Sequence, residues 1–377
     1  MLKKPLFLLP ILIFVLSCSS GKKALQKGNY YQAIAQAVDR LKSDPDNEKA
    51  SKVLREGYPL AIDWSQEELD FALSSNKAFK WEQTIATMQQ VNRLSEIIRS
   101  TPAARKIISD PKTYTSELNM AYEKAASERY QAGIYHLEQN SREAARTAFE
   151  HFYKADQFIP GYENVVQEME IAKDLATYKV IIEAATVQSR TYKLTSEFFY
   201  NQVFEFLNNK YPERSFVNFY SPQQAKRFQI SQPDFIVQME FFDFSVGNLV
   251  RNEKEEELIK RVQVETKDTT RVTYKTYKAK LKTFSDKVIS GGRLNYRIID
   301  FQTDNLLRDK LIPGSFTWEN QYAIYVGDKQ ALSEKQYELT RNKALPLPPH
   351  QDLFIEFTRP IYENLCDDLD RFFRRYR

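Results

Sequence analysis

The sequence is poor in the residue types that build most catalytic and metal sites. It has two cysteines, three histidines and ten glycines among 377 residues. Two cysteines exclude a disulfide-rich scaffold, and the histidines are scattered along the chain, so neither type predicts a metal site. No glycine-rich loop follows a predicted strand in the way that phosphate binding requires. We therefore expect no cofactor, no metal and no catalytic residue. The three histidines are His136, His151 and His350.

A long apolar run occurs only at the amino terminus. Residues 5–16 are mostly apolar and follow Lys3 and Lys4, a pattern too short to cross a bilayer and typical of an export signal. Val15-Leu16-Ser17-Cys18 resembles the lipobox of bacterial lipoproteins, although that group usually has Leu at the first position. The resemblance implies that residues 1–17 are a signal peptide, that Cys18 carries lipid, and that the protein is anchored in the cell envelope, at the outer membrane facing the periplasm. An ordinary cleaved signal or an uncleaved anchor is the alternative.

Lipidation of Cys18 would leave Cys366 as the only thiol, so the mature chain could form no internal disulfide. The chain has 54 basic and 50 acidic residues. Removal of Lys3 and Lys4 with the signal leaves 52 against 50, a formal charge of +2. This balance gives no reason to expect nucleic-acid binding. The length predicts two domains or more.

Residues 18–176 have the periodicity of helices, with apolar residues every three or four positions. Gly28-Asn29-Tyr30-Tyr31-Gln32-Ala33-Ile34, followed by Asp44-Pro45-Asp46-Asn47, resembles the second helix and exit turn of a tetratricopeptide repeat. Ala148, Phe152, Ala155 and Pro160 have the spacing of the same helix. The match is incomplete, because the two copies are not separated by a multiple of the repeat length. We predict degenerate or elongated helical hairpins, with a plain helical bundle as the alternative.

Residues 177–344 read as an α/β domain. Strands are predicted at 178–184, 216–220 and 234–244, and helices at 195–211 and 222–228, with Phe198, Val203, Phe206 and Leu207 inward. Residues 252–270 are strongly charged and predict a loop. Residues 272–284 and 294–301 predict a long antiparallel pair that turns at Ser290-Gly291-Gly292, with the lysines between 275 and 282 facing water.

This order of elements resembles the α/β domain shared by the TolB amino-terminal region, the curli-secretion lipoprotein and the lipoprotein activators of penicillin-binding proteins. Two short motifs carry the resemblance: Asp234-Phe235-Ile236-Val237 and Ile299-Asp300-Phe301-Gln302-Thr303. The chain departs from the group at Asp304, where a glycine is usual. An unrelated α+β domain with the same order of elements is the alternative.

Residues 345–377 combine a proline-rich link with a helix. Pro360 predicts a kink or a restart, and one face of this helix is apolar, which favours burial against its own domain. Asp367, Asp368 and Asp370 and the terminal arginines read as solvated charges. The predicted fold class is thus α+β: a helical-hairpin region, a mixed α/β sheet domain and a carboxy-terminal helix.

The sequence favours a non-enzymatic envelope scaffold that binds a protein partner, because helical-hairpin arrays leave grooves free for contacts. A curli-type secretion-channel subunit is one alternative, although the charged residues 252–270 argue against it; an envelope hydrolase is the other.

One helix pair holds more large aromatic rings than a thin core needs, and aromatic rings are favoured at interfaces. These candidate partner-binding residues are Tyr122, Tyr130, Tyr135, Phe149, Phe152 and Tyr153.

Overall fold

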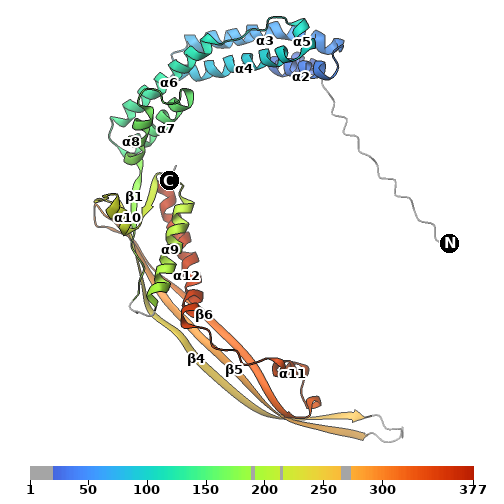
Figure 1. Ribbon diagram of the computed structural model, residues 1–377, viewed down its shortest axis with the longest axis vertical. Coiled ribbons are helices and arrows are strands. Elements are labelled where there is room, and N and C mark those ends of the chain that lie inside the picture. The colour runs from blue at the N-terminus through green and yellow to red at the C-terminus, as the bar shows by residue number, and fades with distance from the viewer. Residues whose placement is uncertain (1–19, 188–191, 213–214, 265–272) are drawn as a thin grey trace, which may run out of the picture. The chain divides into compact units, whose positions relative to one another are not determined.

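The structure is a computed structural model that describes residues 20–187, 192–212, 215–264 and 273–377. The chain divides into two compact units, one ending at Ala176 and the other comprising Thr177–Arg377. The first, the helical unit, is built of helices, and the second, the sheet unit, combines a mixed sheet with helices (Figure 1). This confirms the predicted α+β class.

The helical unit contains eight helices in the residues that the structure describes. They are α1 (Lys22–Gln26), α2 (Tyr30–Ser43), α3 (Glu48–Ser74), α4 (Lys80–Ser100), α5 (Pro102–Ile107), α6 (Ser116–Leu137), α7 (Arg142–Phe158) and α8 (Val165–Ala176).

Side-chain caps explain where two of these helices begin. The Asn47 side chain accepts the backbone N–H of Ala50 at the start of α3, at 3.0 Å. The Ser141 hydroxyl accepts that of Ala144 at the start of α7, at 3.2 Å. Such caps satisfy backbone donors that the first helical turn leaves unpaired. The turn predicted at residues 44–47 is confirmed between α2 and α3.

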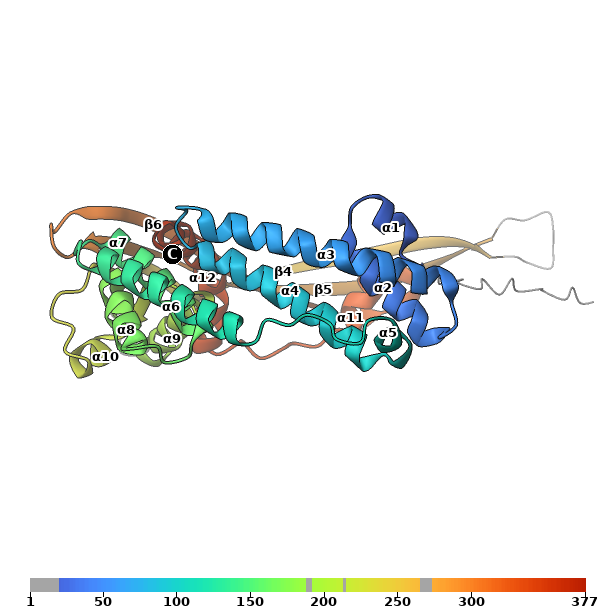
Figure 2. The same ribbon diagram turned by 90° about the horizontal axis from the view of Figure 1, so that it is seen from above.

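Small residues let the helices of this unit approach closely. α3 and α4 are 27 and 21 residues long and run side by side (Figure 2). α6 and α7 meet where Gly133 faces the fully buried ring of Phe152; a Cβ atom at Gly133 would lie 2.5 Å from that ring. Alanines fill equivalent positions elsewhere. Those with no exposed surface include Ala33, Ala37, Ala50, Ala61, Ala121, Ala148 and Ala155.

The sheet unit contains six strands and several helices in its described residues. They are β1 (Tyr178–Ile182), β2 (Thr186–Val187), α9 (Lys193–Lys210), β3 (Val217–Tyr220), α10 (Pro222–Arg227), β4 (Phe235–Val264), β5 (Thr273–Asp300), β6 (Leu306–Gly327), η2 (Lys329–Ala331), α11 (Glu334–Arg341), α12 (His350–Phe373) and η3 (Arg374–Tyr376).

The strands lie in the order β3-β1-β4-β5-β6, and β2 also pairs with β4. β1 is parallel to β3 and β4, whereas β5 is antiparallel to both of its neighbours, β4 and β6. β4, β5 and β6 are 30, 28 and 22 residues long. At ~3.3 Å per residue, β4 alone is on the order of 100 Å long. The sheet is therefore much longer than the helices that cover it.

α9 and α12 lie against one face of the sheet, at the end nearest β1 and β3 (Figure 1). Alternate residues of β4 and β5 point to this face, among them the buried Phe241 and Tyr296. The predicted apolar stripe of the carboxy-terminal helix is buried here, as expected. α12 continues through Pro360 without a break. Its buried apolar residues include Phe354, Phe357, Ile361, Leu365, Leu369 and Phe372.

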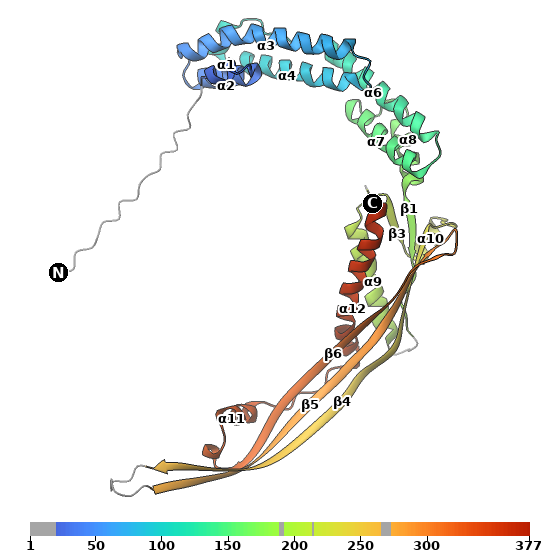
Figure 3. The same ribbon diagram turned by 180° about the vertical axis from the view of Figure 1, so that it is seen from behind.

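Farther along, β4, β5 and β6 continue beyond α12 as a narrow ribbon (Figure 3). A small core packs here between the strands and the segment that follows β6, with Ala279 and Leu281 against Ala331 and Leu332. β6 ends at Gly327, opposite Ala279. Beyond that point, β4 and β5 are the only strands of the ribbon within the residues that the structure describes.

Two predictions about this ribbon are wrong. Residues 252–264 belong to β4 and are not a loop; the rest of the predicted loop lies outside the described residues. The predicted hairpin at Ser290-Gly291-Gly292 does not exist, because β5 runs through these residues. Both glycines serve close packing: a Cβ atom at Gly292 would lie 2.4 Å from Phe244 Cβ, and one at Gly291 would lie 3.1 Å from the Gly314 carbonyl oxygen.

One residue predicted to point inward on α9 does not. Phe198 is 48% exposed, and its neighbour Phe199 is buried instead, against Phe241. Val203 and Leu207 are buried as predicted, and Phe206 is half-buried. The prediction erred by one position because the run Phe198-Phe199 offers two adjacent rings, and the helical period alone does not choose between them.

Candidate interaction surfaces

The six candidate aromatic residues lie on α6 and α7, and the structure separates their environments. Phe152 is fully buried, so its ring belongs to the core and is closed to a partner. Tyr135 is 65% exposed. The other four are half-buried and contact neighbouring rings: Tyr122 lies tilted against Phe158, Tyr130 lies tilted against Phe152 and edge-on to Tyr162, and Phe149 stacks on Tyr153.

A charged cluster connects α4, α6 and α7. Arg129, which is 7% exposed, pairs with Glu82 and lies over the Phe79 ring at 3.5 Å from its centroid. Its Nη1 donates to His151 Nδ1 at 3.0 Å, and the His151 ring stacks on His136. Two histidines far apart in sequence are thus neighbours, which sequence reasoning missed.

Burial and the nearby Arg129 charge lower the pKa of His151 to about 4. Its imidazole is therefore neutral at pH 7, and its Nδ1 can accept a hydrogen bond from the Arg129 guanidinium. A guanidinium held by a carboxylate, an imidazole and an aromatic face is satisfied on several sides. The cluster joins the three helices through contacts of a single arginine.

An apolar stripe on α3 was not anticipated from the sequence. Trp64 and Phe71 are 41% and 62% exposed, and Leu60 is 44% exposed. Their separations of four and seven residues place them on one side of the helix. We call Leu60, Trp64 and Phe71 the α3 stripe. The spacing was readable from the sequence, but nothing there distinguishes an exposed apolar stripe from a buried one.

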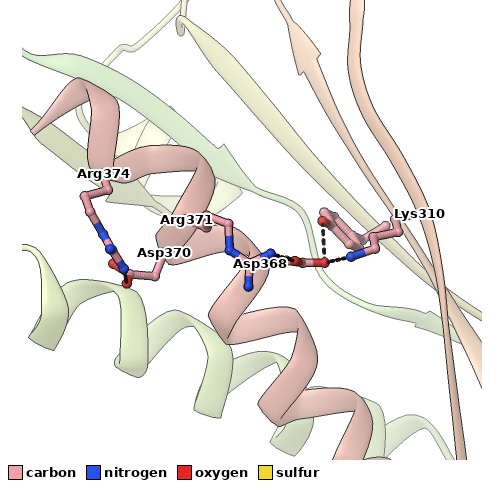
Figure 4. Close-up of polar contacts among 6 residues, drawn as sticks. Lys310, Asp368, Asp370, Arg371 and Arg374 are labelled. Carbon is pink, nitrogen blue, oxygen red and sulfur yellow. Dashed lines mark hydrogen bonds and ion pairs between the residues drawn. The ribbon is translucent and has the colours of Figure 1, made fainter.

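Asp367 of α12 is exposed as the sequence predicted, but Asp368 and Asp370 are not solvated charges. Asp368 accepts hydrogen bonds from Lys310 and from Arg371, the latter at 3.3 Å, and Asp370 accepts one from Arg374 at 2.6 Å (Figure 4). Both aspartate side chains are only about a tenth exposed, at 12% and 10%.

The Asp370 carboxylate also accepts the Tyr211 hydroxyl at 3.1 Å. Burial alone would raise the pKa of Asp370, but the hydrogen bonds from Arg374 and Tyr211 outweigh it and hold the pKa below its usual range. These contacts join α12 to α9, and the Lys310 contact joins α12 to β6. They serve the fold of the sheet unit.

Oppositely charged side chains pair between β4 and β5 along the ribbon. On one face, Glu253 and Glu257 of β4 pair with Lys282 and Lys280 of β5, at 2.8 Å and 3.3 Å. Lys275, Lys278 and Lys280 are exposed, as predicted, and Lys282 is half-buried. The argument against a channel subunit took residues 252–270 to be a charged loop. Residues 252–264 are charged but belong to β4, so the loop assignment is wrong for them.

An ion pair between an exposed arginine and a buried aspartate lies in the middle of the ribbon. Arg251 donates to both carboxylate oxygens of Asp286, at 2.6 Å and 2.8 Å. Asp286 is 2% exposed, and the hydrogen bonds from Arg251 hold its pKa below the usual range.

Cavities and thiols add little chemistry. A polar cavity of about 180 Å³ lies on the sheet beside Glu183, Gln238, Glu240 and Arg297. Among the described residues, no group of three or more His, Cys, Asp or Glu side chains could hold a metal ion, and no helix there is long and apolar enough to cross a membrane. Cys366 is buried, and burial raises its pKa to about 12. Cys18 lies outside the described residues.

Comparison with known proteins leaves the family open. No family model matches the chain, and no curated protein matches it. A crystal structure described as a homologue of the neuraminyllactose-binding hemagglutinin from Helicobacter pylori is similar over 53% of this chain and 90% of that one. The identity is 10% and the TM-score is 0.27. A similarity at that level carries no argument about function.

Proposed function

We propose that this protein is a bacterial lipoprotein, anchored by lipid on Cys18 at the outer membrane and facing the periplasm, that binds a protein partner and catalyses no reaction. The lipobox-like Val15-Leu16-Ser17-Cys18, directly after a short apolar run, supports the anchor. Partner binding rests on the helical unit.

The α3 stripe is the observation that carries partner binding. Leu60, Trp64 and Phe71 keep between 41% and 62% of their surface open to water, although α3 has a buried face of its own. Large apolar side chains aligned on an exposed helix face are unfavourable in water unless another surface covers them. Tryptophan and other aromatic rings are the side chains on which protein interfaces most depend. The exposed Tyr135 on α6 is a second, isolated contact point.

The details of the sheet unit support its proposed relation to the TolB and curli-secretion group. Asp234 accepts the Lys179 backbone N–H at 2.7 Å, which connects the start of β4 to β1. Asp300 accepts the backbone N–H groups of Gln302 and Thr303 and shapes the turn after β5. Asp304 has a φ of 54°, a left-handed conformation that favours glycine. The motif aspartates thus have defined structural roles. Asp304, at which the chain departs from the group, has a backbone conformation for which glycine is the usual residue.

The helical unit supports a proposed relation to tetratricopeptide-like hairpins more loosely. α2 and α3, and α6 and α7, are packed helix pairs with alanines at their crossings. α3 and α4 are longer than the helices of that repeat, so the proposed hairpins are elongated ones.

Site-directed photocrosslinking in cells tests partner binding. A photoreactive amino acid at position 64 or 71 of the full chain should give a discrete crosslinked protein band. Arg55 is exposed on the opposite side of α3, so the same probe at position 55 should give none. Trp64→Ala with Phe71→Ala should remove the complex while leaving the melting temperature within a few degrees. Equal crosslinking at 55, 64 and 71, or none at all, would reject the α3 stripe as the binding surface.

A further inference from the structure

β4 has a neighbouring strand on only one side for most of its length. β1 and β2 pair with it only as far as Phe241, whereas β5 pairs with it up to Val264. Along residues 242–264, no strand in the described parts of the chain lies on the outer side of β4. Alternate residues of an edge strand direct their backbone N–H and C=O groups outward, where another strand can pair with them.

The outer part of this edge reverses its charge within a few residues. Residues 253–257 hold four glutamates and Lys254, which pairs with Glu256 at 2.8 Å, and they are followed by Lys260 and Arg261. The net charge therefore changes from negative to positive along the segment. We call residues 253–261 the charged edge. Its side chains are exposed, apart from the half-buried Glu256 and Leu258. The charged edge reaches past Leu258, where β6 has ended and the ribbon is only two strands wide.

This charge pattern is complementary to itself when two copies run antiparallel. If Leu258 of one copy lies opposite Leu258 of another, then Glu256 faces Lys260 and Glu255 faces Arg261. The two-fold axis through Leu258 repeats both pairs. Opposite charges directly across two antiparallel strands stabilise the pairing. Two copies placed parallel and in register would instead set glutamate against glutamate.

We propose that the charged edge pairs with the charged edge of a second copy of this chain, which joins the two sheets across a two-fold axis. Charges on an edge strand often prevent such pairing, and a row of one sign would repel its own copy in any orientation. Here the sign reverses at the centre of the segment, so antiparallel copies attract. The pairing is independent of the lipid anchor and of the α3 stripe, and it adds self-association to the proposed function.

Charge exchange between two differently tagged full-length copies, produced in one cell, tests the pairing. Wild-type copies should co-purify. When both copies carry Glu255→Lys and Glu256→Lys, the amount of co-purified partner should fall at least ten-fold, because both halves of the edge are then basic. Two copies that both carry Lys260→Glu and Arg261→Glu should lose as much, because both halves are then acidic. One copy of each kind should co-purify again, to within about two-fold of wild type, since lysines then face glutamates.

A matched control reverses charge on β5, the strand that pairs with the other side of β4. Lys275→Glu with Lys278→Glu alters two exposed lysines of β5 that lie opposite Val262 and Ile259 and do not belong to the outer edge of β4, so this variant should leave co-purification intact. Melting temperatures of all variants should stay close to wild type. The proposal is overturned if wild-type copies do not co-purify, if either charge reversal leaves co-purification unchanged, or if the mixed pair fails to recover it.

Discussion

Gly133→Ala probes the packing on which the helical unit depends. Gly133 lies on α6 against the fully buried ring of Phe152 on α7. A Cβ atom there would lie 2.5, 2.7 and 2.8 Å from three carbon atoms of that ring. A buried aromatic ring between two helices has little room to move, so either the ring or the helix must shift.

Two effects of opposite sign set the size of the change. Overpacking of a core costs about 1–3 kcal/mol, and three close contacts place this site at the upper end. Alanine is also more favourable than glycine inside a helix, which stabilises the variant by ~1 kcal/mol. We therefore expect a net loss of about 2 kcal/mol in the free energy of unfolding. For a unit of this size, that loss lowers the melting temperature by about 4–8 °C.

Gly57→Ala is the matched control, followed by circular dichroism or calorimetry of the full chain. A Cβ atom at Gly57 would lie 3.1 Å from a methyl group at the end of the flexible Leu25 side chain, which can move aside. This variant should melt at or above the wild-type temperature. In the Gly133→Ala background, Phe152→Leu should cost at least ~1 kcal/mol less than in wild type, because the pair is coupled. If Gly133→Ala melts as high as Gly57→Ala, the close approach of α6 and α7 is wrong.

Three further predictions concern the ion pair in the ribbon, the buried thiol and the two units. Asp286→Asn should lower the free energy of unfolding by about 1 kcal/mol at pH 7, because Arg251 loses a charged partner but is itself half exposed, so that water screens the pair. Since the folded-state pKa of Asp286 is lowered, wild type should keep this stability above about pH 4 and lose it as the pH falls further, whereas a urea titration of Asp286→Asn should show a smaller acid dependence. Cys366, with its raised pKa, should react with iodoacetamide only after unfolding; rapid labelling of the native chain would contradict its burial. Residues 21–176 and 177–377, expressed separately, should each melt cooperatively, and if neither does, the two-unit division fails.

The helical periodicity of the sequence located most of the helices, because turn residues separate them clearly. Asn47 and Ser141 cap helices as their residue types suggest, and the carboxy-terminal stripe is buried as its spacing predicts. The first strands of the sheet unit were found because alternate residues such as Val180 and Ile182 are buried.

The ribbon was missed for a physical reason. A strand with water on both faces has no apolar alternation, so residues 252–264 resemble a charged loop. Gly291 and Gly292 carry the usual signal of a turn, yet they are needed for close packing inside β5. β6 was not predicted at all.

Tertiary contacts explain the other misses. Asp368 and Asp370 look like solvated charges until α12 is placed against its partners on β6 and α9. His136 and His151 are neighbours only because α6 and α7 pack together. The α3 stripe could have been noticed from its spacing, but its exposure could not. In each case the side chain's environment depends on a different element of the fold.

The most direct test of the central proposal, that this is a lipid-anchored protein, is the mass of its mature amino-terminal peptide. The protein should be purified from membranes, digested and analysed by mass spectrometry. The lipoprotein assignment predicts a first peptide that begins at Cys18 and carries diacylglycerol on the cysteine sulfur, and Cys18→Ser should move the chain to the soluble fraction. A mature chain that begins at another residue, with Cys18 absent or unmodified, would contradict it.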